Sequence, residues 1–284
     1  MTTDTLTTTK CLEDAEPCAV WPPEAPPRAR VDLMGMGIDP LTEDEVRAVV
    51  RDALVAGWGG WIVTPNVDHL RLFRGADDLR ALYGRADLVL ADGMPLIWAS
   101  RLRGTPLPAR VPGSDLVWAL SSVAAEAGAS AFLLGGNPGV AELAAEELER
   151  RYPGLRIAGT MCPPRGFEHD PAEMERIRTT LAAVSPSLVY VALGFPKAER
   201  LIDLLRSVLP RTWFVGVGIG LSFVCGDVAR APHWMQTTGL EWIHRLLMEP
   251  RRLFKRYVMH DAPFAVRLLS HSAWQGAVRR LRRG

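Results

Sequence analysis

Seven short apolar runs, separated by segments long enough to form helices, do most to limit how this chain can fold. Buried parallel strands are apolar on both faces and are joined by crossover helices. The pattern therefore predicts an α/β fold, with a Rossmann-like, mostly parallel sheet and helices on both of its faces. The runs are Val31–Ile38, Trp61–Thr64, Leu88–Ala91, Ala131–Leu134, Leu155–Ala158, Leu188–Leu193 and Trp213–Val217.

Composition divides the chain into three parts. Residues 1–30 are rich in Thr, Pro and acidic residues and are too polar to pack, so a disordered leader is predicted. Residues 31–238 are predicted to form the α/β domain, and residues 239–284 a basic helical appendage. The net charge is only +1, yet residues 241–284 hold ten Lys or Arg against three acids, a net charge of +7. The body is therefore mildly acidic and its end strongly basic.

Cysteine usage and hydropathy indicate a cytoplasmic protein. The four cysteines form no CxxC pair and no metal-ligand spacing, which fits a reducing compartment. The start, MTTDTLTTTK, lacks the features of a signal peptide, and no run reaches the roughly 18 apolar residues that a spanning helix needs. Contact with a membrane is therefore expected only at its surface. No metal, cofactor or nucleic acid is predicted, and a homo-oligomer is left open.

Start signals locate several helices. Thr42 and Glu45 have the spacing of a capping box, and Ser114 or Asp115 is expected to open a helix over residues 116–127. Pro138 is expected in the first turn of a helix over residues 140–151. Exposed helix positions are predicted for His69, Asp77 and Asp78.

Polar residues at predicted strand ends are the candidates for chemistry, because open α/β sheets bind ligands there. Asp92 directly follows the run Leu88–Ala91, which suggests a general base. Arg110 lies in a loop bounded by proline and glycine, and its guanidinium suits a phosphate, although it could simply be a solvated loop residue. Thr64 and Asn66 could orient a ligand hydroxyl, or Asn66 could cap the following helix.

Two glycine-rich loops each lead from a strand into a helix, GGNPG at residues 135–139 and GFPK at residues 194–197. Their backbone N–H groups and the positive helix ends would suit a diphosphate, and tight-turn geometry is the alternative explanation. The second loop is not a P-loop, because Lys197 is followed by Ala198 rather than by Ser or Thr. A third stretch, Gly216-x-Gly218, is not a dinucleotide fingerprint, because Leu221 stands where the third glycine should be. A Rossmann dehydrogenase and a P-loop ATPase are disfavoured.

The basic appendage has the pattern of an amphipathic helix. Leu247 and Phe254 can share one face with further leucines, while Arg245, Arg252 and Arg256 lie beside it. Such a pattern, with its aromatic residues, indicates an interfacial membrane anchor. A packed helix pair with a solvated basic face is the alternative.

Several motifs, in this order, resemble the TagA/WecG/CpsF glycosyltransferase family over about residues 31–258. The resemblance implies inverting, metal-independent transfer of a sugar from a UDP-sugar to a polyprenyl-diphosphate-linked sugar at the cytoplasmic membrane face. The sugar would be N-acetylmannosamine-type, its uronic acid or a hexose, for a teichoic acid or other polysaccharide. The motifs are TPNVDHL, LVLADGMPLIWASRLRG, RVPGSDL, FLLGGNPGVAE, RYPGLRIAGT, VALGFPKAER, GVGIGLSF and RAPHWMQTTGLEWIHRLLMEPRRLFKRY.

Residue roles are implied by position within that resemblance. Asp92 would be the general base that deprotonates the acceptor hydroxyl. Thr64 and Asn66 would position sugar or acceptor, and Arg110 would hold phosphates of the acceptor or leaving group. Further substrate-binding residues would be Gly135, Gly136, Asn137, Gly194, Pro196, Lys197 and Glu199. The appendage would dock to the membrane and the lipid diphosphate through Arg245, Arg252, Lys255 and Arg256.

Two positions depart from the family pattern. Ala198 stands where Gln is usual, and Ser222 where many members have Asp. These departures leave a second hypothesis open, a catalytically weakened nucleotide-sugar-binding component of a polysaccharide-assembly complex. A nicotinamide-dependent oxidoreductase is a distant third.

Overall fold

The computed structural model describes residues 29–282. The predicted leader lies almost wholly outside the described residues. The predicted fold class is confirmed, because the main sheet has six strands in the order β4-β3-β8-β7-β5-β6 and every neighbouring pair is parallel. The strands are β3 (Gly60–Val63), β4 (Leu88–Val89), β5 (Ser130–Gly135), β6 (Arg156–Met161), β7 (Leu188–Ala192) and β8 (Trp213–Gly216).

The first apolar run does not join this sheet. Val31–Ile38 instead folds into an antiparallel hairpin of β1 (Val31–Leu33) and β2 (Met36–Ile38). The chain reverses at Met34 and Gly35, whose φ angles are 53° and 94°, and glycine suits such a left-handed turn. The periodicity of a single long strand was therefore the wrong interpretation at this run, because a two-residue turn leaves the apolar pattern unbroken.

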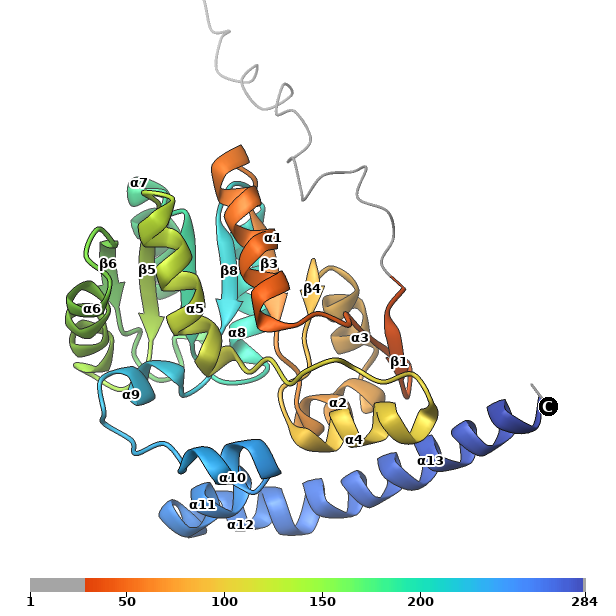
Figure 1. Cartoon of the computed structure of the whole chain (residues 1–284). Coiled ribbons are helices and arrows are strands. Elements are labelled where there is room, and N and C mark those ends of the chain that lie inside the picture. The colour runs from red at the N-terminus through yellow and green to blue at the C-terminus, as the bar shows by residue number, and fades with distance from the viewer. Residues whose placement is uncertain (1–28, 283–284) are drawn as a thin grey trace, which may run out of the picture.

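Helices cover both faces of the sheet (Figure 1). Adjacent residues of β7 point into opposite cores: Val189 and Val191 into one, Leu188 and Tyr190 into the other. This two-sided burial is why the strands appear as continuous apolar runs. One core is covered by α1 (Glu43–Ala56), α5 (Gly113–Glu126), α6 (Val140–Arg151) and α9 (Gly220–Val224). The other is covered by α2 (Val67–Gly75), α3 (Asp77–Gly84), α4 (Met94–Arg103), α7 (Pro171–Val184) and α8 (Lys197–Arg206).

The helix starts agree with the sequence in part. The Thr42–Glu45 capping box is present, with the Thr42 N–H donating to Glu45 Oε2 at 2.7 Å. The other two helices form, and α6 has the predicted range of residues 140–151, but the start signals predicted for them were wrong. Helix α5 begins at Gly113 after Pro112, without a side-chain cap, and Pro138 precedes the Gly139 cap of α6. Asp115 lies within the first turn of α5 and forms an ion pair with Arg230, described below.

The basic end of the chain is helical, as predicted, but its helices begin before residue 239. They are α10 (His233–Thr238), α11 (Glu241–Met248), α12 (Pro250–Phe254), a π-helical stretch η2 (Lys255–Asp261) and α13 (Ala262–Leu281). Figure 1 shows α10–α12 below the carboxyl ends of the strands and α13 running along α4. Within residues 29–282, no helix combines the length and the apolar content needed to cross a bilayer.

Helix α13 is packed on the body rather than attached loosely to it. Leu268 is fully buried in the core that α2, α3, α4, α7 and α8 cover. A Cβ atom at Gly276 would collide with the carbonyl oxygen of Leu102 in α4. Glycine at this position therefore allows the two helix backbones to touch. The C-terminal helices consequently form one structure with the α/β body.

Candidate active site

Asp92 lies just beyond β4, where the sheet edge meets the C-terminal helices. Its backbone N–H donates to the Pro65 carbonyl oxygen at 2.9 Å, which ties the end of β4 to the end of β3. The neighbouring Gly93 has φ of 132° and lies against Asn66, so glycine permits the turn that follows the carboxylate. The structure thus brings Asp92, Thr64 and Asn66 together, because β3 and β4 are neighbours in the sheet.

The carboxyl group of Asp92 is half-buried, and its surroundings alter its acidity. Burial raises the pKa of Asp92 to about 6, since a charged carboxylate loses hydration inside the protein. The Arg110 and Arg245 guanidinium groups lower this pKa, while the carboxylates of Glu241 and Asp115 raise it. A carboxylate with a raised pKa among charged groups has the properties of a general base.

Thr64 and Asn66 have structural contacts of their own. The Thr64 hydroxyl donates to the Gly216 carbonyl oxygen at 3.4 Å, across to β8. A Cβ atom at Gly113 would come within 2.7 Å of that same carbonyl, so glycine lets the start of α5 approach the strand end. The Asn66 side-chain oxygen accepts from the Asp68 and His69 N–H groups at 3.0 and 3.2 Å, which confirms the capping alternative. A ligand contact by either side chain stays a prediction.

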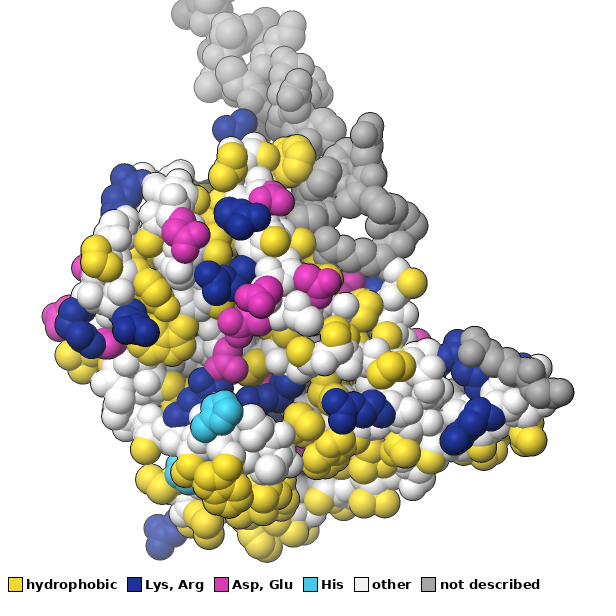
Figure 2. Space-filling view, viewed as in Figure 1, with side chains coloured by type: hydrophobic (Ala, Val, Ile, Leu, Met, Phe, Trp, Pro, Cys, Tyr) yellow, Lys and Arg dark blue, Asp and Glu magenta, His cyan; other side chains and the backbone are white. Residues whose placement is uncertain are grey.

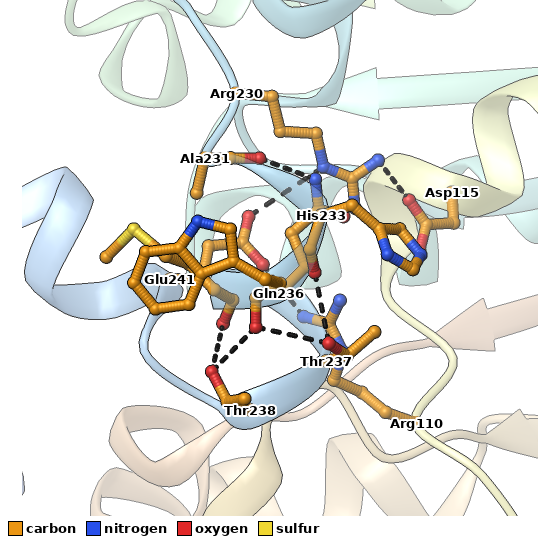
Figure 3. A network of polar contacts seen from close by, with 11 residues as sticks. Arg110, Asp115, Arg230, Ala231, His233, Gln236, Thr237, Thr238 and Glu241 are labelled. Carbon is orange, nitrogen blue, oxygen red and sulfur yellow. Dashed lines mark hydrogen bonds and ion pairs between the residues drawn. The ribbon is translucent and has the colours of Figure 1, made fainter.

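Arg110 belongs to an ion-pair network that sequence reasoning missed (Figure 3). Its Nη1 donates to Glu241 Oε2 at 2.9 Å, and both side chains are more than four-fifths buried, at 16% and 17% exposure. The second oxygen of Glu241 lies 3.9 Å from Arg230 Nε, and Arg230 also pairs with Asp115. Residues 110 and 241 are 131 positions apart, so nothing in the local sequence links them. The only signal was that each charged residue lies within a family motif.

The four basic residues predicted for the lipid diphosphate do not form one patch. Arg245 is half-buried and influences Asp92, whereas Arg252 is exposed and pairs with Glu249 at 2.8 Å. Lys255 is exposed. Arg256 turns inward, with its Nε 3.0 Å from an oxygen of Asp68 and 3.5 Å from one of Asp261. Of the four, only Arg252 and Lys255 are therefore exposed enough to meet a membrane surface, whereas Arg245 and Arg256 face the body of the protein.

The two glycine-rich loops lie side by side at the ends of β5 and β7. The Gly136 N–H donates to the Ala192 carbonyl oxygen at 2.9 Å, which joins the loops. Lys197 is half-exposed and pairs with Glu168, so its charge is partly used within the protein. Strand β8 and strand β3 separate these loops from Asp92. The predicted residues of the α/β domain therefore form two clusters at the carboxyl ends of the strands. One cluster follows β3 and β4, and the other follows β5 and β7.

The position after Lys197 is part of the core. Ala198 is 3% exposed and packs among core residues, so its side chain faces the body of the protein. Ser222, the other departure, is also buried. Glu199 is 6% exposed, burial raises its pKa to about 7, and its Oε2 has no hydrogen-bond partner. Glu199, in the first turn of α8, therefore holds a buried carboxyl oxygen that accepts no hydrogen bond within the described residues.

The prediction of an exposed His69 was wrong, whereas Asp77 and Asp78 are exposed as predicted. The imidazole stacks on Phe195 of the GFPK loop with ring centroids 4.2 Å apart, and its Nδ1 shares a hydrogen bond of 3.2 Å with the Tyr83 hydroxyl. Burial lowers the pKa of His69 to about 3, so the ring is neutral at physiological pH. His69 therefore links α2 to the loop after β7.

The fold is that of an open α/β sheet, the class of protein that binds ligands beyond the carboxyl ends of its strands, and Asp92, with its raised pKa, lies at one of these ends. Residues 31–277 match the Glycosyl transferase WecG/TagA/CpsF family, and the chain belongs to this family. It is accordingly a glycosyltransferase.

Two curated relatives bear the same name, N-acetylglucosaminyldiphosphoundecaprenol N-acetyl-beta-D-mannosaminyltransferase. The one from Bacillus spizizenii (strain ATCC 23059 / NRRL B-14472 / W23) is 33% identical over 68% of this chain and 73% of its own length. The one from Bacillus subtilis (strain 168) is 31% identical over 59% of this chain and 63% of its own length. By name, both relatives are transferases of an N-acetylmannosaminyl group, and this chain is similar to them over these spans.

Proposed function

We propose that this chain is an inverting, metal-independent transferase that moves a sugar from a UDP-sugar to a polyprenyl-diphosphate-linked sugar. The donor sugar would be N-acetylmannosamine, its uronic acid or a hexose, and the names of the relatives favour the first. The observation that carries the proposal is the half-buried Asp92, whose pKa is raised to about 6, beside Arg110 and Arg245. Asp92 would supply the base, and the two guanidinium groups would supply positive charge at the same strand end.

The proposed transfer is one displacement. The Asp92 carboxylate takes the proton from the acceptor hydroxyl, whose oxygen forms a bond to the anomeric carbon of the donor sugar. The bond from that carbon to the phosphate oxygen breaks, and its electron pair leaves with UDP. Attack from the face opposite the leaving group inverts the configuration. Guanidinium groups near Asp92 would stabilise the negative charge that develops on the leaving diphosphate.

The donor would lie along the sheet edge. Strands in a sheet are about 4.8 Å apart, so the three steps from β4 to β7 span about 14 Å between Asp92 and the GFPK loop. This length suits a nucleotide-sugar with its sugar near Asp92. Thr64, in the Asp92 cluster, contacts the end of β8 on the side toward the second cluster, and Glu199 would offer its unpartnered oxygen to a ligand hydroxyl.

The C-terminal helices would place this site at the inner face of the plasma membrane. Figure 2 shows hydrophobic side chains gathered at the bottom of the view, where α10–α12 lie. Exposed apolar side chains beside basic ones are what an interfacial helix presents to lipid. The apolar residues of α10–α13 with high exposure are Trp234, Trp242, Leu247, Met248, Phe254, Val258, Met259, Val266, Trp274 and Leu281.

Product formation tests the proposal. We expect the purified chain to transfer N-acetylmannosamine from its UDP-sugar to a lipid-diphosphate N-acetylglucosamine, with inversion detected by NMR, and to keep its rate when EDTA is added. Binding of UDP without any product would instead favour the nucleotide-sugar-binding component. Loss of the rate on chelation would contradict metal independence.

The rate of transfer is expected to depend on pH through Asp92. A base acts only in its deprotonated form, and since burial raises the pKa of Asp92 to about 6, that form disappears as pH falls through this value. We expect kcat/KM to be level above about pH 7 and to fall about tenfold per pH unit below about pH 5. Circular dichroism at each pH would check that the protein stays folded. A level profile down to about pH 5 would exclude Asp92 as the base.

A further inference from the structure

Arg230 has no part in the function proposed above, yet its guanidinium is held firmly. It follows α9, pairs with Asp115 in the first turn of α5, and lies over the Phe223 ring at 5.8 Å from the centroid. Its Nε and Nη2 atoms are nevertheless buried without a hydrogen-bond partner. Buried charged donors without an acceptor are costly and rare, and a bound anion would supply acceptors for these two atoms.

Arg110 faces Arg230 across the carboxylate of Glu241 (Figure 3). One oxygen of Glu241 accepts a hydrogen bond of 2.9 Å from Arg110, while the other lies 3.9 Å from Arg230, too far for a hydrogen bond. A single carboxylate therefore joins the two guanidinium groups without satisfying both. An anion with more oxygens and more charge would match the two forks better.

The surroundings of this pair also favour an anion. The Nε atom of Arg245 is likewise buried without a hydrogen-bond partner, and its charge reaches Asp92. The positive start of α5 is packed against the β8 end through Gly113, close to Thr64. Three guanidinium groups and one helix start would thus lie near the proposed leaving group.

We propose that Arg230 and Arg110 together bind a diphosphate, that of the nucleotide-sugar donor, and that Glu241 is the internal counter-ion which this diphosphate replaces. This inference rests on the proposed function, because it names the group that Arg110 holds. It adds Arg230 as a binding residue and makes Glu241 a competitor of the ligand rather than a contact to it.

Titration of UDP into Arg230→Gln tests the binding site. We expect the dissociation constant of UDP to rise at least about tenfold, as for the loss of hydrogen bonds to a charged group, and Arg230→Lys to recover part of the affinity. Arg211→Gln is the matched control, because Arg211 is exposed before the amino end of β8, at the end of the sheet opposite to the site. Unchanged UDP affinity in a folded Arg230→Gln protein would overturn the proposal.

Glu241→Gln tests the counter-ion. We expect it to bind UDP about three- to tenfold more tightly, because the competing charge is gone, and to show a larger rise in melting temperature on adding UDP. Glu249→Gln removes the same charge from the end of the same helix, outside the network, and is expected to leave UDP affinity unchanged. Weaker UDP binding by Glu241→Gln would overturn the counter-ion role.

The source of the diphosphate is separated by a second titration, with farnesyl diphosphate in place of UDP. If Arg230→Gln weakens farnesyl diphosphate and not UDP, the site belongs to the lipid-linked acceptor and the assignment to the donor is wrong. Transfer by the unaltered protein is measured in parallel. Its absence would count against the proposed function, whereas normal transfer with unaltered UDP affinity in both variants would count against this inference alone.

Discussion

Asp92→Asn is expected to lower the rate of transfer by about 10²- to 10⁴-fold while UDP still binds. The asparagine side chain has the same shape, and the hydrogen bond to Pro65 comes from the backbone, so the strand end is kept. What is lost is the ability to take a proton. The measurement is transfer to a lipid-diphosphate-sugar analogue, with UDP binding followed by calorimetry.

Thermal stability provides an independent check on this variant. A carboxyl group whose pKa is raised in the folded protein costs stability at any pH above its unfolded value, since it must ionise in a buried place. We therefore expect Asp92→Asn to melt at or above the temperature of the unaltered protein at pH 8. Asp77→Asn, on the exposed start of α3, should leave activity unchanged and lower stability by less than about 1 kcal/mol, through its exposed ion pair with Arg80 and the helix dipole. Full activity of Asp92→Asn would remove this residue from the mechanism.

The second large effect is expected at the membrane. Replacing both Leu247 and Phe254 by Glu should abolish association with vesicles that contain anionic lipid, measured by co-sedimentation. The two side chains are 73% and 54% exposed, so they contribute little to the core, whereas burial of each in lipid would contribute about 1.5–3 kcal/mol. The new carboxylates would also be repelled by the lipid charge.

A matched control separates the membrane face from general hydrophobicity. Leu143→Glu changes a leucine of 54% exposure on α6, away from the C-terminal helices, and is expected to leave vesicle binding unchanged. Transfer to a long-chain acceptor in vesicles should fall with the double substitution, while transfer to a short soluble acceptor should persist. Salt should weaken the attraction, since charge is screened over about 10 Å at 0.1 M. Undiminished co-sedimentation of the double variant would show that another surface meets the lipid.

The parts that local sequence predicts well are those whose physical cause is local. The capping box at Thr42 and Glu45 needs only three residues of spacing, and it forms as expected. Buried parallel strands must be apolar on both sides, so six of the seven runs became strands of the main sheet. The remaining run, Val31–Ile38, forms a hairpin instead, because the turn at Met34 and Gly35 does not interrupt the apolar pattern.

The sequence by itself determined the fold class, the place of Asp92 at a strand end and the helical, basic character of the C-terminal part. Each follows from periodicity, burial or charge over neighbouring residues. Only the tertiary structure decided that Glu241 joins Arg110 to Arg230, that Arg256 turns inward to Asp68, and that His69 is neutral against Phe195. A charged side chain pairs with an opposite charge that lies close in space, and the distance along the chain does not reveal which partner the fold will bring.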